Sequence, residues 1–225
     1  MTHRFCVRSC AVLLLIATFA ALEAGEALQS GPPKGKLIPG QFEPHAPYNL
    51  NGKRKESHHC LVCEYIHEPV VLIFAREPAK DKGQGLNDLL KKLDKAVEDY
   101  KRDELRAFVV FLSPDANSSA NDPKLTDPAK LVEEATAREK LIERLKPHVE
   151  GLKNVIACIY PAAGPKGYAL SDKADVTALY YVKYKVLANA AFKEDELQPK
   201  DADAFLKTVT DQLAKERKKT VPKKK

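Results

Sequence analysis

Three short apolar runs divide the middle of the chain. They cover residues 70–75, 107–112 and 155–160. A continuous apolar run of this length, bounded by polar or turn-forming residues, is typical of a strand buried on both faces of a sheet. Two further runs, 176–182 and 185–192, are separated only by Lys183-Tyr184. This spacing predicts a β-hairpin with a two-residue turn.

Between and after these runs, apolar residues recur every three or four positions, which predicts amphipathic helices. Three such stripes occur: Leu86, Leu89, Leu90, Leu93, Val97 and Tyr100; Leu131, Ala135, Ile142 and Leu145; and Ala202, Phe205, Val209 and Leu213. Asp127-Pro128 predicts the start of the second helix, because an aspartate cap followed by proline is a favourable beginning. We expect Pro147 to help end that helix and Asp201 to cap the last one.

The predicted order is β-α-β-α-β-β-β-α, which indicates one α/β domain over residues 58–217 with helices on the faces of a central sheet. Residues 28–57 contain five prolines. We expect them to form an extended lead-in rather than a packed element, with Phe42 and 49–52 pairing loosely against the domain. The basic residues of 218–225 predict a disordered, solvated tail.

The first 27 residues have a basic start, an apolar run at 11–21 and small residues after it. This is the pattern of a signal peptide, with cleavage expected after Ala24 or Ala27. The apolar run is too short to span a bilayer, and no later stretch could cross one. We therefore expect an exported protein, periplasmic or secreted.

The formal net charge of +6 is spread along the chain rather than gathered into one stripe. Nucleic-acid binding is not expected, because the sequence has no basic patch with interleaved aromatic residues. No Ser/His/Asp triad, P-loop or dinucleotide-binding fingerprint occurs. The sequence does not determine the oligomeric state.

One stretch, 57–67, concentrates residue types that carry chemistry. It holds His58, His59, Cys60, Cys63 and His67. If Ser57 caps a short helix, Cys60, Cys63 and His67 fall on one face of it. A helix start also favours the thiolate form of a nearby cysteine.

The number of cysteines limits which disulfides the chain can form. Of five in the chain, Cys6 and Cys10 would leave with the signal peptide, so Cys60, Cys63 and Cys158 remain. An odd number excludes a fully paired disulfide framework within one chain. Cys158 lies in the middle of a predicted strand, where we expect a buried, unreactive thiol.

Three interpretations of the Cys/His stretch stay open. In the first, Cys60 attacks and Cys63 resolves in thiol–disulfide exchange with protein thiols, without a cofactor, and His59 shares a proton with a neighbouring thiol. In the second, Cys60, Cys63 and His67 bind zinc or copper with His59 or His58, or with a ligand from elsewhere such as His45. In the third, a Cys60–Cys63 disulfide only pins the lead-in to the sheet.

The element order, with its terminal hairpin and helix, resembles the thioredoxin-like fold. The extra strand at 155–160 is similar to that of peroxiredoxins and periplasmic thiol-disulfide proteins. Two local segments add to the likeness: Gly40-Gln41-Phe42 with 49–52, and Tyr168-Ala169-Leu170 before the hairpin. The resemblance implies a three-layer α/β/α sandwich with a mixed sheet, and thiol–disulfide oxidoreductase activity.

The chain departs from that family at the catalytic position. Thioredoxins carry Cys-x-x-Cys after the first core strand, where this chain has 75–80 without a thiol. The Pro-x-x-x-Thr-x-x-Cys motif of peroxiredoxins is missing from the same loop, so we do not expect peroxidase activity. The Cys-x-x-Cys instead lies upstream of the strand, at Cys60 and Cys63.

Overall fold

The computed structural model describes residues 28–79, 82–116, 127–193 and 196–220. The expected signal peptide, 1–27, lies outside the described residues, as do 80–81, 117–126, 194–195 and 221–225. The elements in chain order are β1 (Tyr48–Asn49), α1 (Leu61–Glu64), β2 (Pro69–Arg76), α2 (Gln84–Asp99), β3 (Arg106–Ser113), α3 (Pro128–Val149), β4 (Val155–Pro161), β5 (Val176–Val182), β6 (Lys185–Phe192) and α4 (Pro199–Thr220). Short 3-10 turns cover Lys101–Asp103 and Pro114–Ala116.

The strands form one mixed sheet in the order β1-β4-β3-β2-β5-β6. Neighbours β2, β3 and β4 are parallel, whereas β5 and β6 run antiparallel. The β5–β6 hairpin turns at Lys183 and Tyr184, whose φ values of 49° and 66° are the left-handed pair that a tight two-residue turn needs. The predicted α/β class and the thioredoxin-like sheet with its terminal hairpin and helix are confirmed.

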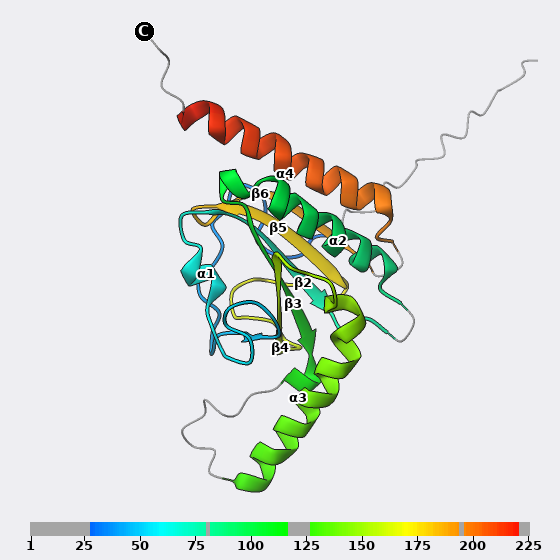
Figure 1. Cartoon of the computed structure of the whole chain (residues 1–225). Coiled ribbons are helices and arrows are strands. Elements are labelled where there is room, and N and C mark those ends of the chain that lie inside the picture. The colour runs from blue at the N-terminus through cyan, green and yellow to red at the C-terminus, as the bar shows by residue number, and fades with distance from the viewer. Residues whose placement is uncertain (1–27, 80–81, 117–126, 194–195, 221–225) are drawn as a thin grey trace, which may run out of the picture.

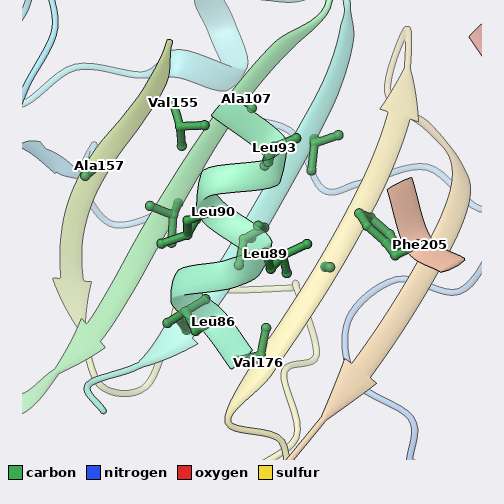
Figure 2. Packing of buried hydrophobic residues seen from close by; sticks show 14 of the residues in the cluster. Leu86, Leu89, Leu90, Leu93, Ala107, Val155, Ala157, Val176 and Phe205 are labelled. Carbon is green, nitrogen blue, oxygen red and sulfur yellow. The ribbon is translucent and has the colours of Figure 1, made fainter. Parts of the chain in front are cut away.

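The long helices all pack on one face of this sheet. The chain passes from β2 to β3 to β4 in one direction across the sheet, so two right-handed crossovers place α2 and α3 on the same side. Helix α4 lies beside α2 over the hairpin end of the sheet (Figure 1). Figure 2 shows the leucines of α2 and Phe205 of α4 meeting the apolar side chains of the strands.

The second face is covered differently. Its cover comes from the short helix α1, the loop around Tyr168 and the lead-in, which contributes Ile38 and Phe42 at 5% and 4% exposure. The expectation that 28–57 is not packed is therefore wrong, although its pairing against the domain through β1 and Phe42 is confirmed. Because no helix lies between β4 and β5, this face depends on α1, the Tyr168 loop and the lead-in for its cover.

Helix α3 differs from its predicted form at both ends. Leu131 is exposed, because the first half of α3 extends past the sheet (Figure 1), and the buried side chains of α3 are Leu141 and Leu145. Pro147 lies inside the last turn of α3, which continues to Val149. Asp127 caps α3 as predicted, accepting a hydrogen bond from the N–H of Ala129 at 3.0 Å.

The last helix, α4, begins at Pro199 rather than at a cap on Asp201. Asp201 lies in its first turn and accepts a hydrogen bond from the N–H of Gln198 at 3.0 Å. The helix ends at Thr220, so it takes in the first part of the expected tail 218–225. No helix in the described ranges is both long and apolar enough to cross a membrane.

Candidate redox site at Cys60 and Cys63

Cys60 and Cys63 form a disulfide around the start of α1. Their Cα atoms are 5.3 Å apart. Cys60 itself is the N-cap of α1, with extended backbone, and its Sγ accepts a hydrogen bond from the N–H of Cys63 at 3.2 Å. Ser57 is not the cap, because its hydroxyl donates to the carbonyl of Arg54 instead. The helix has only four residues, so the local N–H, rather than a long macrodipole, provides the favourable interaction with sulfur.

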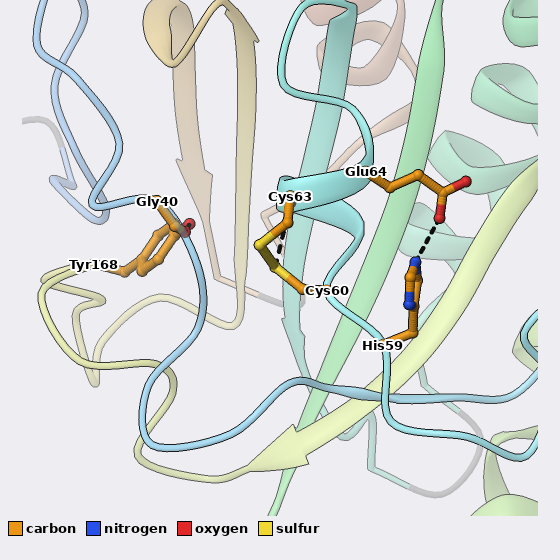
Figure 3. The surroundings of a disulfide bond; sticks show 6 residues. All are labelled: Gly40, His59, Cys60, Cys63, Glu64 and Tyr168. Carbon is orange, nitrogen blue, oxygen red and sulfur yellow. Dashed lines mark hydrogen bonds and ion pairs between the residues drawn. A yellow bond between two sulfur atoms is a disulfide. The ribbon is translucent and has the colours of Figure 1, made fainter.

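The site is held by the apolar residues between the two cysteines. Leu61 and Val62 are buried in the second face of the sheet, whereas Cys63 is exposed and Cys60 is half-buried. Beside the disulfide run the lead-in at Gly40 and the loop at Tyr168 (Figure 3). The Tyr168 hydroxyl donates to the carbonyl of Gly40 at 2.6 Å, which fixes these two segments to each other.

His59 does not lie against a sulfur in this oxidised form. Its Nε2 lies 2.6 Å from Oε2 of Glu64, and the ring points toward that carboxylate on the side away from the sulfurs (Figure 3). The expected proton sharing with a neighbouring thiol is thus not the arrangement seen here. The sequence analysis missed Glu64, because a spacing of five residues across a helix start matches no helical pairing rule.

The other expected metal ligands are spread around the site. Nδ1 of His58 lies 2.8 Å from the carbonyl oxygen of Ala46, and His67 is exposed beyond the end of α1. The His45 and His58 rings meet edge to face, with centroids 5.8 Å apart. Within the described ranges, no three His, Cys, Asp or Glu side chains are grouped closely enough to hold a metal ion. Metal binding by Cys60 and Cys63 would first require the disulfide to be reduced.

The disulfide does not pin the lead-in to the sheet. It joins residues three positions apart, within α1 and its cap. The lead-in is held by other contacts, such as the Asn49 N–H donating to the Ser57 carbonyl at 3.0 Å and the packing of Phe42 on Phe74. A staple between distant segments is therefore excluded as the role of this bond.

The loop where thioredoxins carry their cysteines is occupied by a charged network. The guanidinium of Arg76 donates to the Ala174 carbonyl at 3.2 Å and to Asp172 at 3.0 Å. Glu77 accepts from Arg144 at 2.5 Å and from the Ser113 hydroxyl at 2.7 Å. These bonds tie the end of β2 to its surroundings and provide no redox group.

Cys158 is fully buried on β4, as expected. Its Sγ–H donates to Oδ1 of Asn49 at 3.0 Å, and burial raises the pKa of the thiol. A thiol that stays protonated and covered does not act as a nucleophile.

Comparisons with known proteins find solved structures that are similar to this chain. No family model and no curated protein matches the sequence. Among solved structures, similar ones include a candidate thiol:disulfide interchange protein DsbE from Chlorobium tepidum, at 15% identity over 79% of this chain and 99% of that chain, with a TM-score of 0.44. Peroxiredoxin Q of Xanthomonas campestris matches at 9% identity over 79% and 97%, with a TM-score of 0.45. Copper-bound ScoI of Arabidopsis thaliana matches at 11% over 74% and 98%, with a TM-score of 0.39. At these identities and scores they transfer no residue roles, and the fold assignment rests on the strand order itself.

Proposed function

We propose that this protein exchanges electrons with protein thiols through the Cys60–Cys63 disulfide, as a thiol–disulfide oxidoreductase. The observation that carries the proposal is a disulfide closed within one helical turn, with Cys63 exposed and the sulfur of Cys60 hydrogen-bonded to the N–H of Cys63. A bond in this position links no distant segments of the chain. Its proposed role is therefore redox chemistry and not the crosslinking of the fold.

In the reducing direction, the thiolate of Cys60 attacks one sulfur of a partner disulfide. The partner's S–S bond breaks, a mixed disulfide forms at Cys60, and the other partner sulfur leaves as a thiolate. The thiolate of Cys63 then attacks the Cys60 sulfur, which releases the second partner thiolate and closes the Cys60–Cys63 disulfide. The partner gains two electrons and the protein loses two; running the steps backward oxidises a partner dithiol.

We assign the attack to Cys60 because the N–H of Cys63 donates to its sulfur and stabilises it as a thiolate. The greater exposure of Cys63 favours the opposite order. His59 is the proposed group for proton exchange, which requires its ring to leave Glu64 when the pair is reduced. The test is the rate at which the oxidised protein oxidises a dithiol peptide. Wild type is compared with Cys60→Ala/Cys63→Ala, which should be inactive, and with His59→Ala.

A metal site is the second candidate for the reduced pair. Two thiolates three residues apart, with His58 and His67 in neighbouring turns, are donors suited to zinc or copper. Mass spectrometry of the reduced protein under native conditions tests it. A stoichiometric metal that protects both cysteines from alkylation supports this candidate, and full alkylation in the presence of zinc or copper rejects it.

We further propose that the chain is exported after cleavage of residues 1–27. The proposal is supported by the basic start, the apolar run and the small residues near Ala24 and Ala27. An oxidising compartment would keep the Cys60–Cys63 bond closed. Mass spectrometry of the protein from the expressing cells tests this: a mature N-terminus after Ala24 or Ala27 supports export, and an intact N-terminus contradicts it.

A further inference from the structure

A cavity of about 340 Å³ lies beside α1, and neither Cys60 nor Cys63 lines it. It lies between the loop after β1, helix α1, the end of α2 and the start of β4. Its size falls within the range of sites for small molecules. The cavity shares Glu64 with the redox site but neither of its cysteines, so ligand binding here does not require the proposed exchange at Cys60 and Cys63.

Charges line this cavity unevenly. Five basic residues contribute to its wall against three acidic ones: Lys53, Arg54, Lys101, Arg106 and Lys153, and Glu64, Glu68 and Glu98. All three carboxylates are already engaged. Glu68 pairs with Arg106 at 2.5 Å, Glu98 pairs with Lys101 at 3.6 Å, and Glu64 pairs with His59 at 2.6 Å.

Within the described ranges, three of the five basic side chains form no ion pair with a carboxylate. In the part of the chain that the structure describes, no ion pair within 4.0 Å involves Lys53, Arg54 or Lys153. Lys53 and Arg54 come from the loop after β1, and Lys153 comes from the turn before β4. Cations from two separate segments around one hollow produce a positive potential there, which attracts an anion.

Part of the cavity wall is apolar, and this part is called the floor. It is made by Leu61 of α1, by Leu105 and by Ile156 of β4. Gly52 brings the loop close to this floor, since a Cβ at that position would meet Cδ1 of Ile156 at 2.5 Å. Asn49 also lines the wall, and its buried Nδ2 has no hydrogen-bond partner among the described residues. A wall that combines apolar side chains with basic ones suits a ligand with an apolar body and an anionic group.

We propose that this cavity binds a small molecule that carries a phosphate or carboxylate group on an apolar body. The anionic group is bound by Lys53, Arg54 and Lys153, and the apolar body lies on Leu61, Leu105 and Ile156. The site requires both parts of the ligand. An inorganic anion lacks the contact with the floor, and a neutral aromatic compound lacks the contact with the cations.

The test uses the purified chain at low ionic strength and three probes: phenyl phosphate, phthalate and benzyl alcohol. Calorimetric titration measures affinity, and amide shifts in NMR spectra locate the site. We expect saturable binding of phenyl phosphate or phthalate with shifts at Gly52 and Asn154, and no binding of benzyl alcohol. The probe that binds more tightly shows whether the anionic group of the ligand is a phosphate or a carboxylate.

Lys53→Ala/Arg54→Ala removes two of the three cations from an exposed loop. It should weaken binding at least about tenfold. The matched control, Lys200→Ala/Lys215→Ala, makes the same change in charge on exposed positions of α4 and should leave affinity within about twofold. The proposal is overturned if neither anion saturates, or if both double variants lose affinity equally.

Discussion

The backbone N–H of Cys63 donates a hydrogen bond to Sγ of Cys60 at 3.2 Å, across the start of α1. The two cysteines are thus unequal: one sulfur receives the hydrogen bond, and the other residue is the more exposed. In the proposed exchange reaction, this inequality would decide which cysteine attacks first, and single-cysteine variants can reveal that order.

Cys63→Ala should accumulate a mixed disulfide with a partner, because Cys60 can attack but nothing remains to resolve the product. Cys60→Ala should accumulate less, since its remaining thiol lacks the hydrogen bond that stabilises a thiolate. Non-reducing gels of cells or of mixtures with a disulfide peptide measure both. The control is Cys158→Ala, which removes the buried thiol and should trap the same amount of partner as the wild type. Stronger trapping by Cys60→Ala would reverse the assigned roles.

Cys60→Ala/Cys63→Ala should stay folded. The closed loop contains few residues, so the chain-entropy contribution of this disulfide is at most about 2 kcal/mol. Leu61 and Val62 keep α1 on the sheet without it. Urea unfolding of the oxidised protein and the variant measures the difference. A much larger loss, or a lead-in that becomes protease-sensitive, would mean that the bond stabilises more than α1.

Only two thiols should react in the reduced native protein after removal of residues 1–27. Burial raises the pKa of Cys158 and covers its sulfur, so it should react only after unfolding. Counting thiols with a coloured reagent, with and without denaturant, checks this. Equal reactivity of all three cysteines in the native state would show that β4 is accessible from the second face.

Glu77→Gln should destabilise the fold by about 1–2 kcal/mol at pH 7, because Glu77 accepts charge-assisted bonds from Arg144. Burial raises the pKa of Glu77, but the bonds from Arg144 and Ser113 outweigh it and leave the pKa below its ordinary value of 4.5. A lowered folded-state pKa means that the stabilisation is complete above pH 4.5 and is lost as the pH falls through the folded value.

Urea unfolding at pH 7, 5, 4 and 3 tests this pH dependence. The difference between wild type and Glu77→Gln should shrink over the lowest pH values. Glu98→Gln is the control, because Glu98 is exposed and pairs only at 3.6 Å with Lys101, so its effect should be small at every pH. A difference for Glu77 that is the same at pH 3 and pH 7 would contradict the proposed charge dependence.

The strands and their faces could be predicted from the sequence because the pattern is local. Val71 and Ile73 face the long helices while Val70 and Leu72 face the lead-in, and both sets are buried, so the run is continuously apolar. The hairpin was predictable for the same reason. The exposure of Leu131 was not predictable, since periodicity gives the apolar side of a helix but not how far the sheet extends beneath it.

The candidate site was only half predictable. The spacing of Cys60 and Cys63 indicated their pairing, and the structure contains that disulfide. The orientation of His59 depends on Glu64, and the cavity beside α1 depends on Lys53 and Lys153, which lie far apart in the chain. No local pattern connects such residues, because the sheet brings them together.

The reduction potential of the Cys60–Cys63 pair decides whether this disulfide can exchange electrons with protein thiols. It is measured by trapping thiols in buffers of graded dithiol and disulfide ratio. We expect a value between about −120 and −270 mV, the range of proteins that exchange disulfides. A value below about −300 mV is typical of structural disulfides and would contradict the proposed function.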